Sequence, residues 1–163
     1  VMRLPMVYGL GDKGNIARMV GAVAARRFPA WPRIENRRSA IHVEDAVAAA
    51  ILIARHPRSA GQIYYATDGV AYSTRWIYEQ ILLALGRPIP RWRVPLGALR
   101  IAAVLGSTAE LSLRQRMPLT LEGLRKLAGD SWFSSDKLSR TLGFTPRHSL
   151  ADEIQRLAQR LAA

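Results

Sequence analysis

The sequence predicts an α/β fold in which short strands alternate with amphipathic helices. Segments rich in β-forming residues occupy 1–8 and 62–67, and each is followed by a glycine-containing turn. Helical spacing of apolar residues follows each turn and returns at 150–161. Strands that alternate with helices usually pair in parallel, because each connection crosses back over the sheet. We therefore expect parallel strands covered by helices.

Size and composition are those of one ordinary globular core. The 163 residues are 49% hydrophobic, which suffices for a single domain with at most a small appendage. No run of about 18 uncharged apolar residues occurs, and the N-terminus lacks the pattern of a signal peptide. These features predict a cytoplasmic protein without a membrane partner.

Metal and hydrolase chemistry are not favoured. The chain contains no cysteine, which excludes disulfides, thiolate nucleophiles and thiolate metal ligands. No two of its histidines, His42, His56 and His148, stand at i, i+3 or i, i+4, so we expect no metal site. Residues 134–136 and His148 contain the groups of a hydrolase triad, but no G-x-S-x-G motif places a serine on a strained turn.

Basic residues outnumber acidic ones. Lys and Arg total 24 against 12 Asp and Glu, which gives a formal net charge of +12. An arginine-rich chain suits the recognition of phosphate or carboxylate groups, so we expect an anionic ligand. The arginines are spread over predicted helices, where solvated faces explain them, and nucleic-acid binding is not favoured. A complete basic module that binds nucleic acid or a phosphorylated ligand without catalysis is the alternative to an enzyme.

The N-terminal segment 1–8 is predicted to be one strand, with Pro5 at an edge or where pairing stops. Because Val1 already lies inside this apolar run, we expect the chain to be a piece of a longer protein. A G-x-G-x-x-G motif at 9–14 then opens a predicted helix from Asn15 to about Arg27.

This motif with Glu35 farther on has the form of a dinucleotide fingerprint, in which glycines let the backbone approach a pyrophosphate. The strand before it should then be a continuous apolar run, whereas Arg3 and Pro5 interrupt it. We therefore give the fingerprint less weight than a second interpretation of the same residues, described below.

The arginine pair Arg37 and Arg38 stands before a short extended stretch, 39–42, and a helix over 43–54. Two carboxylates in the first turn and apolar residues on one face favour that helix. His42, at the junction, is expected to be a partly buried, hydrogen-bonding residue. Two guanidinium groups are thus predicted just before a buried helix.

The remaining elements follow from capping residues, turns and apolar spacing. They are a strand at 62–67, a helix from an N-cap at Ser73 to Leu85 with Gly86 as its stop, a strand at 91–95, helical segments at 96–105 and from Gly106-Ser107 to Met117-Pro118, a helix at 120–128 and a last helix at 150–161.

Four patches resemble the extended short-chain dehydrogenases/reductases, the NAD-dependent epimerase/dehydratase family. They lie, in the family's order, at 3–11 with Asn15, at 38–45, at 61–88 and at 129–146. The second patch carries an arginine three residues before Ile-His-Val-x-Asp, and the last carries Ser-x-Lys-x-x-x-x-Leu-Gly-aromatic-x-Pro. The resemblance implies the late part of a Rossmann-type doubly wound sheet over 1–30, and mainly a small mixed α/β substrate-binding lobe over 31–163.

The resemblance also implies site residues. Leu4, Pro5 and Met6 match the segment that lines the nicotinamide of the cofactor. Asn15 and Arg38 match the residues that bind the substrate's diphosphate, and Arg37 is the reserve candidate for Arg38.

Two positions depart from the family pattern. Leu10 replaces the usual proline, which alters loop stiffness. Met6 stands where several epimerases carry a substrate-binding asparagine, so that particular polar contact is not expected.

Catalytic residues of this family are absent from the chain. None of the five tyrosines is followed by lysine four residues later, and the Gly-rich first turn of the family is also missing. The resemblance therefore implies a C-terminal half that is inactive without the missing N-terminal half of its domain. The intact protein is expected to use NAD or NADP on a nucleotide-sugar-like substrate, as an epimerase, dehydratase or reductase, and a homodimer is compatible with it.

Overall fold

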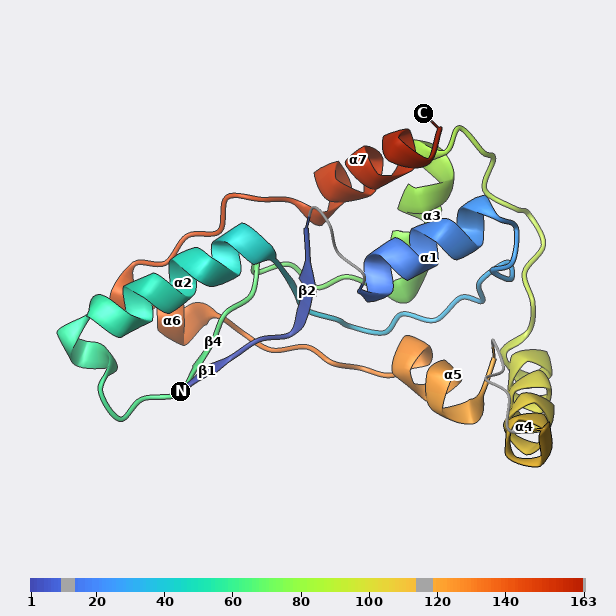
Figure 1. Cartoon of the computed structure of the whole chain (residues 1–163), viewed down its shortest axis with the longest axis horizontal. Coiled ribbons are helices and arrows are strands. Elements are labelled where there is room, and N and C mark those ends of the chain that lie inside the picture. The colour runs from blue at the N-terminus through green and yellow to red at the C-terminus, as the bar shows by residue number, and fades with distance from the viewer. Residues whose placement is uncertain (10–13, 114–118, 163) are drawn as a thin grey trace.

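The computed structural model describes residues 1–9, 14–113 and 119–162. The chain is an α/β structure with short parallel strands near its middle, and this confirms the predicted class. In Figure 1, α1, α3 and α7 gather on one side of the strands, α2 and α6 lie on the other, and α4 and α5 project at one end.

The predicted N-terminal strand is divided in two. β1 (Met2–Arg3) pairs in parallel with β4 (Tyr64–Tyr65), and β2 (Met6–Tyr8) pairs in parallel with β3 (Ala40–His42). Pro5 lies at the division, where its missing N–H cannot take part in a ladder. The expectation of one continuous strand over 1–8 was therefore wrong. The strand divides at Pro5, where pairing was expected to stop or to meet an edge.

The predicted strand at 62–67 is also shorter than expected, because only its centre is paired as β4. The Tyr64 N–H donates to the Val1 carbonyl and the Ala66 N–H to the Arg3 carbonyl. Beyond β4 the chain moves next to β3, and the Asp68 N–H donates to the Ala40 carbonyl at 2.8 Å. β3 is thus held between β2 and the segment that follows β4.

α1 (Asn15–Ala24) begins where the sequence predicted and ends earlier. Arg26, with φ of 56°, reverses the chain direction after the helix. The Arg87 guanidinium donates two hydrogen bonds of 2.7 Å to carbonyl oxygens at the end of α1. These bonds add to the main-chain cap, in which the N–H groups of Arg26 and Arg27 donate to carbonyls of the last turn at 3.0 and 2.8 Å.

Three predicted helix starts are confirmed by their capping bonds. α2 (Val43–Arg55) is capped by the His42 side chain, which accepts from the Glu44 N–H. Ser73 caps α3 (Thr74–Ala84), and Thr120 caps α5 (Leu121–Ala128).

Two predictions between 91 and 118 were wrong. Residues 91–95 form no strand, since the Val94 N–H to Ala30 carbonyl bond is isolated from any ladder. α4 (Leu96–Leu113) continues through Gly106 and Ser107 without a break. The predicted end at Met117-Pro118 lies outside the described residues.

The C-terminal part adds a helix that the sequence did not suggest as a separate element. This is α6 (Asp136–Leu142), which Gly143 ends with φ of 73°. The last helix, α7 (Leu150–Ala162), is confirmed, and η1 (Pro57–Ser59) is a single 3₁₀ turn. No helix in the described part of the chain combines the length and the apolarity needed to cross a bilayer.

Two apolar clusters form the core. The larger, which we call the helical cluster, joins α1, α3, α4, α5 and α7 around Trp31, Ile81 and Ile154. The smaller joins α2, α6 and the paired strands around Ile41 and Leu138. The candidate site lies on the helical cluster, beside the end of the strands.

Candidate functional site

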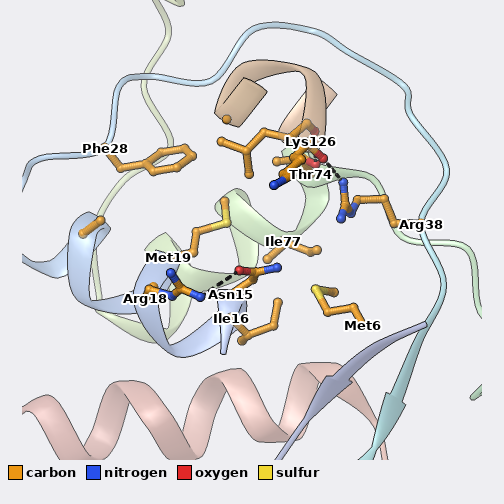
Figure 2. Close-up of a pocket in the computed structure, with 13 residues that line it drawn as sticks. Met6, Asn15, Ile16, Arg18, Met19, Phe28, Arg38, Thr74, Ile77 and Lys126 are labelled. Atoms are coloured by element: carbon orange, nitrogen blue, oxygen red, sulfur yellow. Dashed lines mark hydrogen bonds between the residues drawn. The ribbon is translucent and has the colours of Figure 1, made fainter. Parts of the chain in front are cut away.

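A pocket of about 330 Å³ opens where α1, α3 and α5 approach β2 (Figure 2). Its lining combines polar side chains with a mainly apolar wall. The lining residues are Met6, Asn15, Ile16, Arg18, Met19, Ala22, Phe28, Arg38, Thr74, Ile77, Gly123, Lys126 and Leu127.

The apolar wall follows from helix periodicity. Ile16 and Met19 lie on the face of α1 that packs into the helical cluster, and Ile77 lies on the inner face of α3. Phe28 closes one side, held by stacking on Tyr78 with ring centroids 5.5 Å apart. The wall can bind an apolar or aromatic part of a ligand.

Arg38 reaches the pocket from the segment that leads into β3. Its main chain exchanges two hydrogen bonds of 2.8 Å with Tyr72, which fixes the residue against the start of α3. Its Nη1 donates to the Lys126 carbonyl on α5 (Figure 2). Burial lowers the pKa of Arg38, although a guanidinium stays protonated in proteins. The half-buried side chain therefore carries a fixed positive charge into the pocket.

Asn36 holds the surroundings of Arg38 in place. Its Oδ1 accepts from the Thr74 N–H at 2.9 Å, and its Nδ2 donates to the carbonyls of Leu127 and Gly129 at 3.0 and 3.1 Å. This buried amide thus joins the start of α3 to the end of α5. Sequence patterns do not reveal this residue, because an isolated asparagine has no local signature.

Three of the residues predicted from the resemblance meet in this pocket: Met6, Asn15 and Arg38. Leu4 and Pro5 are not among the lining residues, and Leu4 is 45% exposed. They lie just before Met6 in the chain, on the surface where β1 gives way to β2. The pocket thus contains both residues predicted to bind the substrate, Asn15 and Arg38, and one of the three predicted to contact the cofactor, Met6.

Arg37, the reserve candidate, points elsewhere. Its guanidinium lies over the Trp132 ring at 4.2 Å from the centroid, and it lines a separate groove. Its main-chain N–H donates to the Asp130 carboxylate at 2.7 Å. The adjacent arginines therefore serve different surfaces.

Two cations at the pocket were not predicted. Arg18 lies one turn along α1 from Asn15, whose Oδ1 accepts its hydrogen bond at 3.4 Å. Lys126, on α5, pairs with Glu122 at 2.5 Å. Both lie on predicted helices, and only the fold, which places residues of α1 and α5 around one pocket, reveals their position. With Arg38 they make the pocket suited to an anionic group.

No carboxylate pairs with Arg38 in the part of the chain that the structure describes. Glu44, a candidate surface partner, lies 3.3 Å from His148 instead, and Glu35 lines the separate groove beside Arg37. The positive charge at Arg38 is therefore compensated by main-chain oxygen alone.

A second polar cluster is buried between the two apolar clusters. Tyr72 donates to the Asp68 carboxylate at 2.8 Å, and Tyr8 donates to the same oxygen at 3.4 Å. Burial and then the Asp68 charge raise the pKa of both tyrosines far above the ordinary value, and burial raises the pKa of Asp68. Both hydroxyls thus stay protonated donors, so this cluster is structural.

His42 and His148 join that cluster as a stacked pair, with ring centroids 4.1 Å apart and an interplanar angle of 20°. Burial and then His148 lower the pKa of His42. Ligand atoms of His42, Glu44 and His148 lie within 4.8 Å of one another. Face-to-face rings direct their nitrogen lone pairs into separate planes, which do not converge on one ion. We assign the pair a packing role.

The groups of the hydrolase triad are not assembled. Ser135 is bonded to Thr67, while the His148 ring lies 3.0 Å from Asp45. Asp45 also accepts hydrogen bonds from the main chain at Arg147 and His148, at 3.1 and 3.0 Å. Asp45 therefore ties the start of α2 to the loop before α7.

Gly9, the first glycine of the G-x-G-x-x-G motif, is required for packing. Its φ is 153°, and an added Cβ would lie 2.5 Å from Cγ1 of Val43. The glycine thus lets the chain after β2 approach the start of α2. Residues 10–13 lie outside the described residues, and the last glycine of the motif, Gly14, is the N-cap of α1 in an extended conformation.

Residues 1–66 match the model of the NAD dependent epimerase/dehydratase family. The chain is 23% identical over 160 residues to a UDP-glucose 4-epimerase of Vibrio cholerae, covering 98% of this chain and 45% of that protein. It is 25% identical over 172 residues to a 2-alkyl-3-oxoalkanoate reductase of Stenotrophomonas maltophilia (strain K279a), covering 99% of this chain and 51% of that protein.

Solved structures show the same fold. The dTDP-glucose 4,6-dehydratase DesIV of Streptomyces venezuelae, with NAD and TYD bound, superposes with a TM-score of 0.64 at 20% identity over 97% of this chain and 42% of its own. A UDP-glucose 4-epimerase of Thermotoga maritima, with UDP-glucose, gives 0.63 at 15% identity over 99% of this chain and 45% of its own. The predicted Rossmann-type fold is thus confirmed, and the chain spans about half the length of the proteins it matches.

Proposed function

We propose that this chain, which resembles the C-terminal half of an extended short-chain dehydrogenase/reductase, is the substrate-binding part of an NAD(P)-dependent nucleotide-sugar epimerase, dehydratase or reductase. In this proposal residues 1–30 belong to the late Rossmann sheet and 31–163 mainly to the substrate lobe. The observation that carries the proposal is that Asn15 and Arg38, identified from separate motifs, line one pocket.

Arg38 is the proposed anchor for the substrate's diphosphate. A guanidinium offers five N–H donors in a planar fork, and the bond to the Lys126 carbonyl occupies one Nη1 donor. Asn15 stands at the first turn of α1, where unpaired N–H groups and the helix dipole favour an anion. Arg18 and Lys126 add positive charge around the same opening. The apolar wall with Phe28 would hold the neutral part of the substrate.

The cofactor proposed for the intact protein is NAD or NADP, which supplies hydride transfer when bound. The described residues fit its nicotinamide end in part: Leu4 offers an exposed apolar side chain beside Pro5 and Met6. They do not offer a pyrophosphate cradle, since the Cα of Gly9 packs closely against the Val43 side chain. The chain would therefore position and orient the substrate while other residues of the protein hold most of the cofactor.

Proton transfer is also assigned outside this chain. No tyrosine in the 163 residues is followed by lysine four positions later. The buried hydroxyls of Tyr8 and Tyr72 are held by Asp68 with raised pKa values, which suits donors that keep their protons. The chain alone is accordingly proposed to be inactive.

A second candidate substrate class is an alkyl oxo acid. Met6, Met19 and Ile77 give the pocket an apolar wall, and the relative from S. maltophilia is a 2-alkyl-3-oxoalkanoate reductase. The cations at the opening would then bind the carboxylate. Nothing in the comparisons supports the alternative of a complete nucleic-acid-binding module.

Calorimetry on the full-length protein tests the phosphate anchor, with UDP and NAD as separate ligands. Arg38→Ala should weaken UDP binding roughly ten- to hundredfold, from a loss on the order of 1.5–3 kcal/mol, and should leave NAD binding unchanged. Arg37→Ala is the matched control, because the neighbouring arginine lies over Trp132 instead.

The proposal fails if UDP and NAD weaken together in Arg38→Ala, if neither changes, or if Arg37→Ala has the same effect. Binding of a 3-oxo fatty acid with NADH oxidation in its presence, and no binding of UDP, would favour the second substrate class.

A further inference from the structure

The end of α5 is held by side chains from two other segments. Carbonyl groups in the last turn of a helix have no partner within the helix, so they need donors from elsewhere. The acceptors here are the carbonyls of Lys126, Leu127 and Gly129, and the donors are the side chains of Asn36, Arg38 and Thr74. The guanidinium that lines the pocket thus shares this helix end with two neutral side chains.

Asn36 can make its bonds in one orientation only. Its Oδ1 accepts from the Thr74 N–H at 2.9 Å, and its Nδ2 donates to the carbonyls of Leu127 and Gly129 at 3.0 and 3.1 Å. Because a carbonyl cannot donate and an N–H cannot accept, the reversed amide would make none of these bonds. An aspartate of the same shape would keep the bond to the Thr74 N–H and would place an oxygen against two carbonyls.

Thr74 holds the same carbonyl from the start of α3. Its hydroxyl donates to the Leu127 carbonyl at 2.6 Å and accepts from the Nδ2 of Asn36 at 3.1 Å. Both residues are buried. We call Asn36 and Thr74 the α5 clamp, since together they join α3 and the segment before β3 to the end of α5.

Side chains alternate along the segment that leads into β3. The main chain at Arg38 is bridged on both sides, which keeps this part of the segment extended. Residues two apart in an extended segment point to the same side. Asn36 and Arg38 accordingly both reach α5, whereas the Ser39 hydroxyl exchanges hydrogen bonds of 3.0 and 2.9 Å with the main chain of Phe133.

The α5 clamp fixes the group that orients Arg38. The guanidinium donates to the Lys126 carbonyl, which is the neighbour of the Leu127 carbonyl that the clamp holds (Figure 2). If the end of α5 shifted, this carbonyl would move and the guanidinium would lose its orientation. With the carbonyl in place, the remaining N–H donors of Arg38 are available to the pocket that this side chain lines.

We propose that Asn36 is a positioning residue of the anion site. Together with Thr74 it fixes the end of α5, so that Arg38 presents its free donors to the diphosphate of the substrate. Asn36 is not among the residues that line the pocket, so its effect on the ligand passes through Arg38. The inference rests on the proposed function, which assigns the anion to Arg38.

Calorimetry on the full-length protein, with UDP and NAD as separate ligands, tests this role. Asn36→Asp should weaken UDP binding about three- to tenfold and leave NAD binding unchanged, because two carbonyls of α5 lose their donor. Thr74→Val should also weaken UDP binding, by a smaller factor, and it provides the test if Asn36→Asp does not fold. Thr74→Ser keeps the hydroxyl and should bind UDP as the wild-type protein does.

Ser39→Ala is the matched control for a loss of stability. It removes two hydrogen bonds of a buried side chain on the same segment, but their partner is Phe133 and not α5. The control should lower the unfolding temperature without weakening UDP binding.

A double variant separates positioning from a general structural role. If Asn36 acts through Arg38, adding Asn36→Asp to Arg38→Ala should weaken UDP binding by less than about twofold further. A full additional loss in the double variant, unchanged UDP binding in Asn36→Asp and Thr74→Val, or an equal loss in Ser39→Ala would overturn this inference alone. If Arg38→Ala itself left UDP binding unchanged, the proposed function would fail and the positioning role with it.

Discussion

The pocket and the buried polar cluster use similar residue types for opposite purposes. In the pocket, Arg18 and Arg38 hold positive charge against a carbonyl and an amide oxygen, with no carboxylate partner among the described residues. In the cluster, Asp68 receives both tyrosine hydroxyls. Polar groups that satisfy one another specify the fold, whereas charges left without counter-charges at an opening are available to a ligand.

One short segment supplies both regions. Its beginning supplies Arg38 to the pocket, with Asn36 holding the surrounding main chain. Its end, His42 to Asp45, enters the polar cluster and starts α2. Substitutions in the interior should therefore lower stability, and substitutions at the opening should lower binding without lowering stability. Four measurements on the full-length protein test this contrast.

The largest effect is expected for Asn36→Ala. The change removes the acceptor of the buried Thr74 N–H and the amide donor of the Gly129 carbonyl, which should cost about 2–4 kcal/mol of stability. The Leu127 carbonyl keeps its bond from the Thr74 hydroxyl. Urea unfolding measures it. A loss below about 0.5 kcal/mol would mean that water enters this region and replaces the hydrogen bonds of the amide.

The next effect separates two hydroxyls that share one acceptor. Tyr72→Phe should cost about 1–2 kcal/mol, because its hydroxyl donates to Asp68 at 2.8 Å. Tyr8→Phe should cost less, since its hydroxyl lies 3.4 Å from the same oxygen. Equal losses in urea unfolding would show that the cluster acts as one unit, whose members cannot be ranked by distance.

A pH series examines the histidine pair in the interior. Burial holds the pKa of His42 below its ordinary 6.5, so the unfolded state binds more protons between the two values. Stability should therefore fall as the pH drops below 6.5, by no more than about 1.4 kcal/mol per pH unit.

Groups facing His42 are His148, Glu44, Asp45 and Glu153, and the three carboxylates oppose the lowering. His42→Asn, which keeps an acceptor for the Glu44 N–H, should make the stability curve flatter in this range. A curve as steep as that of the wild-type protein would assign the titration to another group.

The smallest effect is expected at the pocket's exposed edge. Arg18→Ala should weaken UDP binding by about threefold or less and leave unfolding unchanged, because an exposed cation is screened by solvent. Calorimetry beside a thermal melt checks both parts. If Arg18→Ala lost as much affinity as Arg38→Ala, the anion would lie nearer α1 than proposed.

Local signals in the sequence predicted the helix starts and part of the site. Ser73 was recognised as an N-cap, Thr120 as the start of a helix and Pro5 as an edge or a place where strand pairing stops, because each acts through its own backbone neighbours. Asn15 and Arg38 were named through family resemblance, and the structure brings them to one pocket.

Features that depend on distant parts of the chain were missed. Residues 91–95 have the β propensity of a strand but no neighbour to pair with, so tertiary context overrides propensity. Asn36, Lys126 and the stacking of His42 on His148 join segments that are far apart in sequence, and local patterns carry no sign of them. The apolar wall was equally hidden, because its residues looked like ordinary helix cores.

The parallel pairing of β1 with β4 also determines the order in which this chain can assemble as it leaves the ribosome. Met2 and Arg3 emerge before their partners Tyr64 and Tyr65, which follow only after the intervening segment has been made. α1 and α2 can form from local contacts in that interval, whereas the strand must wait and then close a long loop. β1 is thus synthesised well before the strand with which it pairs. Pro5, which interrupts its edge, helps to keep the waiting strand from pairing with other nascent chains.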